Sequence, residues 1–391
     1  MTEATTEAAE RVHVTRSRAK PGGTAADADG TVPFRRARKP PWLKVPAPGG
    51  PTYRRLKAEI GSEGLHTVCE EANCPNVGEC WERGTATFMI LGDVCTRRCG
   101  FCNVKTGVPS WNDPLEPLRV ANQVKRMGLR HAVVTSVDRD DLPDYGAGAF
   151  VGTIRSIRMQ APGCKVEVLT PDFRGQEMPL AKVIHERPDV FNHNVETVPR
   201  LYPKARRGSK FMRSARVLKM AKEMGGEDVV TKSGLMVGLG ESFEEMVETF
   251  KILREHKVQV LTVGQYLRPT ENHLPVVRYW HPEEFEALEK AAYELGFESV
   301  ASGPLVRSSY HADQNLPERA RDVAQWSWPD DFISQGLEEV PGVAEALLAE
   351  GEHLCRLHGE DIGHPAVPVT KAAFAHLEPP AAIPLTLPGV R

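Results

Sequence analysis

The chain has 391 residues, 41% of them hydrophobic, and its 49 basic and 52 acidic side chains give a net charge of −3. This length is enough for two or three domains, or for one large α/β domain with appendages. No run approaches the ~18 consecutive apolar residues of a membrane helix, and the near-balanced charge does not favour nucleic-acid binding. The acidic N-terminus lacks the pattern of a secretion signal, so we expect a cytoplasmic protein that binds neither membrane nor nucleic acid.

Residues 1–41 show no hydrophobic periodicity, and their composition predicts a flexible N-terminal arm. A short basic run from Arg35 to Lys44 ends this arm. Two interpretations stay open for the run: a solvated surface, or a docking element for an acidic partner.

Cysteine placement is the strongest feature of the sequence, because six of the eight cysteines fall within 34 residues. The first group has the spacing C-x4-C-x5-C and consists of Cys69, Cys74 and Cys80. The second has the spacing C-x3-C-x2-C and consists of Cys95, Cys99 and Cys102. A chain of this size without a secretion signal does not depend on disulfides, so the two groups indicate metal binding.

Zinc is one interpretation of these groups, but structural zinc sites favour paired C-x2-C knuckles with four ligands, and only one such pair is present. Two iron–sulfur clusters with three thiolates each would use all six cysteines. A cubane held by three thiolates leaves one iron open for chemistry.

The second cysteine group, with Phe101 before its last cysteine, resembles the signature of the radical S-adenosylmethionine superfamily. The resemblance implies a [4Fe-4S] cluster on Cys95, Cys99 and Cys102 whose open iron binds S-adenosylmethionine. It also implies reductive cleavage of that co-substrate to methionine and a deoxyadenosyl radical, chemistry that belongs to the cofactor more than to the protein.

Six β-rich segments follow, separated by amphipathic helices. The predicted strands are Thr87–Leu91, His131–Ser136, Lys165–Thr170, Val190–Glu196, Thr231–Val237 and Val258–Tyr266. One predicted helix spans 242–258 and starts with a capping box of Ser242 and Glu245, and another runs from His281 to Gly296.

Alternating strands and helices predict parallel strands with right-handed crossovers. Six units are too few for a closed eight-fold barrel, so we expect an α/β fold with an open six-unit partial TIM barrel and its site at the carboxyl ends of the strands. The predicted division is a cluster-binding N-terminal extension at 42–85, a barrel at 86–315 and a C-terminal extension of unknown role at 316–391.

Taken together, the cysteine groups and several later motifs resemble the lipoyl synthase family over roughly residues 39–314. These motifs begin at Lys39, Cys69, Thr135, Asn192, Lys232, Gly264 and Arg307. The resemblance implies that Cys69, Cys74 and Cys80 hold an auxiliary [4Fe-4S] cluster with Ser309 as its fourth ligand. Ser308 is the fallback for that ligand, and Arg307 is a candidate for charge stabilisation.

Contacts to S-adenosylmethionine are expected from three places in the barrel. Thr135 and Ser136 end the second predicted strand, and their hydroxyls could reach the methionine ammonium. Asn192, Asn194 and Glu196 alternate along the fourth, where they could bind adenosine or ribose or simply satisfy polar groups inside the barrel. The Gly234–Gly238–Glu241 stretch resembles a superfamily element in which glycine lets the backbone approach the adenosyl group.

The family resemblance implies insertion of two sulfur atoms at carbons six and eight of an octanoyl-lysine group, with the auxiliary cluster as sulfur donor. The implied partners are octanoylated lipoyl carrier domains (2-oxoacid dehydrogenase acyltransferases and the glycine cleavage H protein), a ferredoxin or flavodoxin reductant, and an iron–sulfur carrier for cluster repair. The Arg35–Lys44 run is a hypothetical docking element for the carrier domain.

Two other functions remain as alternatives from the sequence. A two-cluster electron carrier is disfavoured because each group lacks a fourth cysteine and a large barrel follows. A biotin-synthase-like enzyme is disfavoured by the six-cysteine arrangement together with the Arg-Ser-Ser-Tyr stretch that ends at Tyr310.

Overall fold

A computed structural model describes residues 39–45, 50–62, 65–68, 74, 76–82, 84–109, 112–310, 312–314 and 316–317. Cys69 and nearly all of the predicted N-terminal arm and C-terminal extension lie outside the described residues. None of the described helices is both long and apolar enough to span a membrane.

The main sheet has eight strands in the order β1-β2-β5-β6-β7-β8-β9-β10, and every neighbouring pair from β2 to β10 is parallel. The strands are β1 (His66–Thr67), β2 (Thr85–Ile90), β5 (His131–Ser136), β6 (Lys165–Leu169), β7 (Val190–Asn192), β8 (Val230–Val237), β9 (Val260–Gln265) and β10 (Ser299–Gly303). β1 joins β2 antiparallel, and no pairing between the described β1 and β10 closes the sheet.

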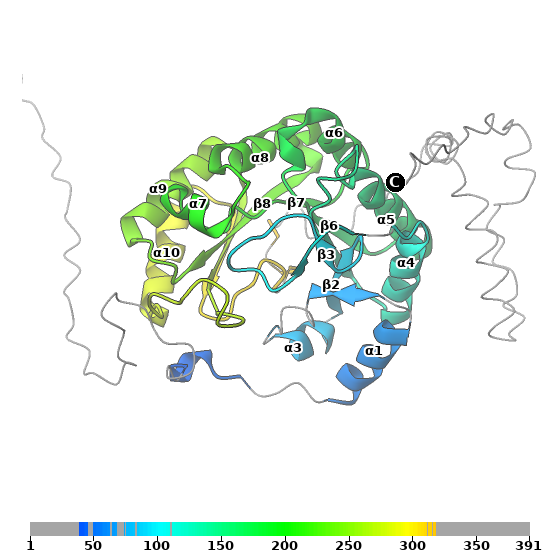
Figure 1. The fold of residues 1–391 in the computed structure, drawn as a ribbon, viewed down its shortest axis with the longest axis horizontal. Coiled ribbons are helices and arrows are strands. Elements are labelled where there is room, and N and C mark those ends of the chain that lie inside the picture. Colours follow the sequence, from blue (N-terminus) through cyan, green and yellow to red (C-terminus); the bar gives the residue numbers. More distant parts are fainter. Residues whose placement is uncertain are drawn as a thin grey trace, which may run out of the picture.

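Six helices connect the seven parallel strands. They are α4 (Glu116–Met127), α5 (Ala147–Gln160), α6 (Glu177–His185), α8 (Phe211–Gly225), α9 (Phe243–Glu255) and α10 (Pro282–Glu294). Figure 1 shows them around the outside of the curved sheet, with α1 (Pro51–Ser62) and α3 (Val77–Glu82) on its open side. This arrangement confirms the predicted six-unit open barrel.

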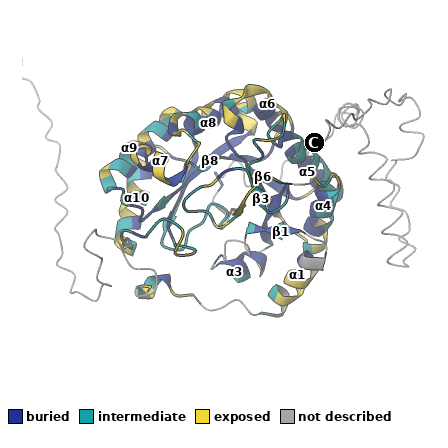
Figure 2. Cartoon of the chain, viewed as in Figure 1, coloured by how far each residue is buried: buried dark blue, intermediate teal, exposed yellow. Residues whose placement is uncertain are grey.

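The two faces of the sheet have different chemistry. Val134, Val168, Phe191 and Leu261 are fully or almost fully buried on the outer face, where they belong to the main apolar core under the helices. The helices accordingly bury one side and expose the other (Figure 2). The inner face carries polar side chains, among them Thr85, Thr87, His131, Glu167, Asn192, Lys232 and Thr262.

A second, small apolar cluster lies on the inner face at the amino ends of the strands. The first residues of β7, β8 and β9 are Val190, Val230 and Val260. Leu316, which is 1% exposed, packs among them. The chain that leaves β10 therefore passes the site and then inserts Leu316 at the far end of the barrel.

One strand prediction was wrong in extent, and one strand was missed. The segment expected to run to Glu196 leaves the sheet after Asn192, because Glu196 has a φ of 68° and makes only an isolated bridge to Leu235. β10 was not predicted, since its sequence Ser-Val-Ala-Ser-Gly carries little β-branched or aromatic content. The capping box of Ser242 and Glu245 at the start of α9 was confirmed.

Candidate functional site

The second cysteine group lies on a loop that crosses the mouth of the barrel. Cys95 ends the short strand β3 (Val94–Cys95), which pairs with β4 (Lys105–Thr106), and the loop between them holds Cys99 and Cys102. All three thiols are free and partly exposed. The loop is the cyan segment across the centre of Figure 1.

The surroundings of these three thiols disfavour their deprotonated form. Burial raises the pKa of Cys95 to about 11 and that of Cys99 to about 12, and it also raises the pKa of Cys102. The thiolate is the form that binds metal, so positive charge in the loop is needed to stabilise three thiolates there. A thiolate-only donor set of this kind fits an iron–sulfur cluster.

Cys95 is the thiol with the best-defined hydrogen bonds. The backbone N–H groups of Arg97 and Asp138 donate to its sulfur at 3.4 Å and 3.3 Å. Hydrogen bonds to the sulfurs are one of the means by which a protein sets the potential of a cluster.

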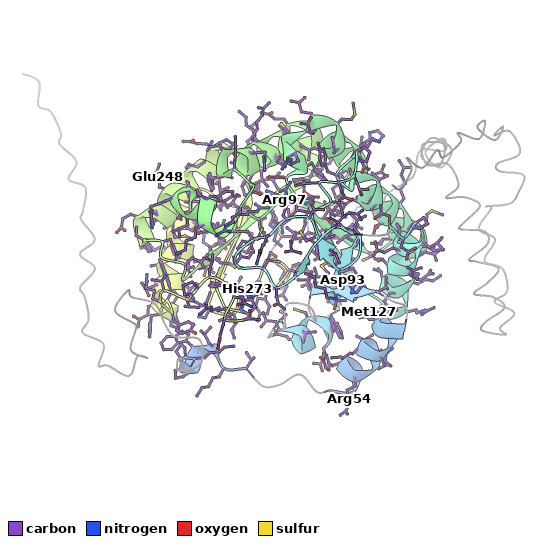
Figure 3. All side chains as sticks on the ribbon, in the orientation of Figure 1. Arg54, Asp93, Arg97, Met127, Glu248 and His273 are labelled. Carbon is purple, nitrogen blue, oxygen red and sulfur yellow. The ribbon has the colours of Figure 1, made fainter. Side chains whose placement is uncertain are left out.

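Arg97 holds the loop to the sheet through three carboxylates. Its side chain is only 4% exposed and lies 3.1 Å from Asp138, 2.6 Å from Asp140 and 2.8 Å from Asp172. Asp138 and Asp140 follow β5, whereas Asp172 follows β6. Figure 3 shows Arg97 at the centre of the molecule, where the carboxyl ends of the strands meet.

Two further loops hold the other side of the cysteine loop. The Gly100 N–H donates to the Ala205 carbonyl at 2.8 Å, and a Cβ on Gly100 would lie 2.9 Å from Leu274 Cγ. Because a Cβ would come so close to Leu274, the packing at position 100 requires glycine. On the other side of the loop, His273 Nε2 lies 2.8 Å from the Cys102 carbonyl oxygen.

Opposite charges gather beside Cys99. Glu196, Arg206 and Asp138 all act electrostatically on its thiol. Burial raises the pKa of Glu196, and the neighbouring Arg206 and Asn194 lower it. Carboxylates and a guanidinium at one side of the thiols are the groups that recognise the ammonium and carboxylate of an amino acid, so this side of the loop fits the methionyl part of S-adenosylmethionine.

Hydrogen bonds to Asn194 and Tyr202 fix the Arg206 side chain. Its Nη1 donates to the Asn194 carbonyl at 2.7 Å and to Tyr202 Oη at 2.9 Å. Burial together with the charge of Arg206 lowers the pKa of His193 to about 3, so His193 stays neutral between Thr170 and Ser214.

The structure places the predicted polar contacts in different environments. The Thr135 hydroxyl donates to the Leu169 carbonyl at 2.8 Å, and the Asn192 amide donates to Glu167 at 2.9 Å. Ser136 Oγ, Asn192 Oδ1 and Asn194 Oδ1, however, are buried and have no hydrogen-bond partner among the described residues. These three oxygens have capacity left for a ligand.

The two glycines of β8 and its following loop leave room for neighbouring side chains. A Cβ on Gly234 would lie 2.7 Å from Asn194 Oδ1, and one on Gly238, whose φ is 107°, would lie 2.1 Å from Gln265 Nε2. Glu241 accepts hydrogen bonds from the backbone N–H groups of Gly238 and Leu239, which fixes the loop.

A separate pocket lies at the open edge of the barrel, beside β2. It is lined by Cys74, Asn76, Cys80, Thr85, Thr87, Arg307, Ser309 and Tyr310. Ser309 is thus beside two of the first-group cysteines, whereas Ser308 does not line this pocket.

Long-range bonds bring the two halves of this pocket together. Asn76 Nδ2 donates to the Leu305 carbonyl at 2.7 Å, and Tyr310 Oη donates to Glu79 at 3.3 Å. Burial raises the pKa of Cys74, and the Asn76 N–H and the charge of Arg307 lower it. Two thiols, a hydroxyl and a guanidinium around one space fit an iron–sulfur cluster with an oxygen ligand.

Sequence reasoning assigned no role to Asn76, Arg97, Asp138 or Arg206. Asp138 and Asn76 lie within the motifs used for the resemblance, and Arg97 lies between two cysteines. The signal that could have found Arg97 was the pairing of a cation inside the cysteine motif with the carboxylate-rich stretch from Asp138 to Asp141.

Comparison with known proteins agrees with this geometry. Residues 89–253 match the model of the radical SAM superfamily, so the class of the protein is that of a radical S-adenosylmethionine enzyme. Residues 23–74 match the N-terminal domain of lipoyl synthase. A lipoyl synthase from Rubrobacter xylanophilus is 59% identical over 74% of this chain and 91% of its own length.

A second curated relative supports the same family. The lipoyl synthase of Stenotrophomonas maltophilia K279a is 54% identical over 71% of this chain and 83% of its own length. Among solved structures, the hydrogenase maturase HydG aligns with a TM-score of 0.45 at 13% identity, over 74% of this chain and 75% of its own. The chain belongs to the lipoyl synthase family.

Family membership confirms several expectations from the sequence. The chain is a sulfurtransferase of the radical S-adenosylmethionine class, and its cofactors are a radical-generating [4Fe-4S] cluster with S-adenosylmethionine and a second, auxiliary cluster. Lipoyl synthesis is its function.

Proposed function

We propose that the two cysteine groups divide the work of sulfur insertion between the mouth of the barrel and the pocket at its open edge. The substrate is an octanoyl-lysine group on a lipoyl carrier domain, and carbons six and eight receive the sulfur atoms. When bound, the cluster at the mouth supplies the electron that cleaves S-adenosylmethionine, and the auxiliary cluster supplies the sulfur.

At the mouth, Cys95, Cys99 and Cys102 are the proposed cluster ligands. Arg97 fixes their loop by its contacts with Asp138, Asp140 and Asp172. Arg206 and Glu196 lie beside Cys99 and supply the charges that would bind the amino-acid part of S-adenosylmethionine.

The proposed contacts to S-adenosylmethionine are Thr135, Ser136, Asn192, Asn194, Glu196, Gly234 and Gly238. The unpartnered Asn192 Oδ1 and Asn194 Oδ1 best support direct contact, because both oxygens can still accept a hydrogen bond. Gly238 supports it less, because a Cβ there would meet the Gln265 side chain. We therefore assign Gly238 to holding the wall in place.

At the open edge, Cys69, Cys74 and Cys80 are the proposed auxiliary ligands, with Ser309 as the fourth. A hydroxyl oxygen is a harder ligand for iron than a thiolate, so Ser309 would be the most weakly held of the four proposed ligands. Arg307 lies against Cys74 and stabilises negative charge there.

The observation that carries this proposal is the common pocket of Cys74, Cys80 and Ser309, which comes from segments more than 200 residues apart and is joined by the Asn76–Leu305 bond. Replacing Ser309 with Ala tests it. We expect deoxyadenosine to form at close to the normal rate while thiolated product falls at least ~10-fold, a loss of about 1.4 kcal/mol or more.

Ser308→Ala is the matched control, since it removes a neighbouring hydroxyl that does not line the pocket. The triple replacement of Cys69, Cys74 and Cys80 with Ala should also keep deoxyadenosine formation and abolish thiolated product. Normal product yield from either the Ser309 variant or the triple variant would contradict the division of roles.

The finer partner assignments are also part of this proposal. Carrier domains of 2-oxoacid dehydrogenases and the glycine cleavage H protein are the acceptors, a ferredoxin or flavodoxin is the reductant, and an iron–sulfur carrier rebuilds the auxiliary cluster. We place the reaction in the cytoplasm. Of the four residues predicted to steer the carrier, Arg35, Arg36 and Arg38 lie outside the described residues, whereas Lys39 is described and exposed.

A further inference from the structure

A cationic surface lies directly over the cysteine loop at the mouth of the barrel. It consists of the exposed side chains of Arg98, Lys204, Arg207 and Lys210. Within the part of the chain that the structure describes, none of these four side chains has an ion pair or a hydrogen bond. Four unpaired cations on one surface stand out in a chain whose net charge is −3.

Two observations at Gly100 bring the segments that carry the four cations together. The Gly100 N–H donates to the Ala205 carbonyl at 2.8 Å. A Cβ placed on Gly100 would lie 3.3 Å from the Lys204 carbonyl oxygen. Arg98 therefore lies beside α7 (Tyr202–Ala205), which continues directly into Arg207 and Lys210. Figure 1 shows α7 on the same face as the cysteine loop.

The same surface lies close to the thiols. Arg98 immediately precedes Cys99, and Arg206, the buried neighbour of Arg207, acts electrostatically on Cys99. Met212, 55% exposed on the first turn of α8, adds an apolar side chain beside Lys210. Methionine surrounded by cations has the composition of a protein-binding surface.

We propose that this surface docks an acidic one-electron carrier protein, which reduces the cluster held by Cys95, Cys99 and Cys102. The inference rests on the proposed function and deepens it by assigning the reductant a place. One electron leaves the reduced partner, which is oxidised, and enters the oxidised cluster; no bond forms or breaks and no proton moves. Electron transfer needs a short path, and the cysteine loop is the part of this surface that lies over the cluster.

Charge complementarity accounts for both the choice of partner and its rate of binding. A patch of one sign speeds the encounter with a partner of the opposite sign by 10-fold to 1,000-fold at low salt, and the gain is lost as salt screens the charges. A small chemical reductant does not need the patch.

The test uses the holoenzyme with Lys204, Arg207 and Lys210 each changed to Glu, leaving the cysteine motif intact. Reduction of the cluster by reduced flavodoxin is followed by stopped-flow absorbance and by electron paramagnetic resonance, without S-adenosylmethionine. We expect the second-order rate at low salt to fall at least ~10-fold and to become nearly independent of salt. Reduction by dithionite should be unchanged.

A control variant carries Lys182→Glu, Lys219→Glu and Lys251→Glu on α6, α8 and α9, with the same change in net charge. It should be reduced by flavodoxin within about twofold of the unaltered rate. Changing the three patch residues to Gln instead of Glu should give an intermediate loss, and this set serves if the Glu variant loses iron.

Three results would overturn the proposal: an unaltered flavodoxin rate in the patch variants, an equal loss in the control, or a raised KM for the octanoylated carrier domain with dithionite as reductant. The last would assign the surface to the carrier. Failure of the proposed function would look different, because the unaltered enzyme would then be reduced normally by flavodoxin and still form no thiolated product.

Discussion

Arg97 Nη2 lies 2.8 Å from Asp172 Oδ1, so a residue inside the cysteine motif is bound to the carboxyl end of β6. Neighbouring charges hold the pKa of Asp172 below its ordinary range although burial acts to raise it, with Arg97 the first of them. The cysteine loop is therefore held by a buried charge cluster that forms when the sheet forms.

Replacing Arg97 with Met should disrupt this loop. Three carboxylates would lose a buried partner, and breaking such a pair costs about 3–5 kcal/mol. We expect a lower unfolding midpoint in urea and less iron at the mouth, measured by iron analysis after anaerobic reconstitution. Arg98→Met is the control, because the Arg98 side chain is exposed; equal losses in the two variants would contradict the anchoring role.

The Asn76–Leu305 bond should control the auxiliary pocket. Asn76→Ala removes the 2.7 Å bond that fastens the 304–310 segment to the first cysteine group. We expect the iron content to fall from about eight to about four atoms per chain while the cluster at the mouth remains. Glu79→Ala, which removes the longer 3.3 Å bond to Tyr310 at the surface, should leave about eight.

Single and double replacements in the ion pair of Glu167 and Lys232 should differ strongly in their effect on the free energy of unfolding. Both side chains are 0% exposed and lie 2.9 Å apart, and although burial acts to raise the pKa of Glu167, Lys232 and His131 lower it to about 2. Glu167→Gln leaves a buried ammonium without its charge partner and should cost about 3–5 kcal/mol.

The variant with both residues changed to Met should recover most of that loss, because it removes both buried charges. Urea unfolding of the holoenzyme measures all three proteins. Equal losses in the single and double variants would mean that the pair contributes by packing alone.

His193 should make the stability depend on pH. Its native pKa is about 3, below the ordinary value of 6.5, so only the unfolded chain binds its proton near pH 6. Stability is then lost as the pH falls, by about 1.4 kcal/mol between pH 7.5 and 5.5. His193→Gln should remove this part of the pH dependence, whereas parallel profiles for the two proteins would contradict it. Urea midpoints at several pH values give the comparison.

The fold was largely predictable because its strands and helices are locally encoded. His131–Ser136 was predicted with its exact bounds, and the α9 start followed from Ser242 and Glu245 three residues later. β10 escaped prediction because Gly303 is selected by tertiary packing: its Cβ would lie 3.3 Å from Val306 Cγ2, so the strand gives up side-chain bulk to let the 304–310 segment fold back.

The site was predictable only in part, for a related reason. The cysteines could be found because their spacing is local, and their ligand roles remain predictions. Asn76 and Leu305 are 229 residues apart in sequence, and Arg97 meets Asp172 across two strands of the sheet. Such contacts depend on strand order, which the spacing of residues along the chain does not encode.

The packing of Leu316 against Val190, Val230 and Val260 gives the lumen a closed end on the side of β7, β8 and β9. The segment that supplies Ser309 is therefore held on both sides, by Asn76 at the open edge and by Leu316 at the amino ends of the strands, so the position of the serine depends on contacts at two opposite ends of the barrel.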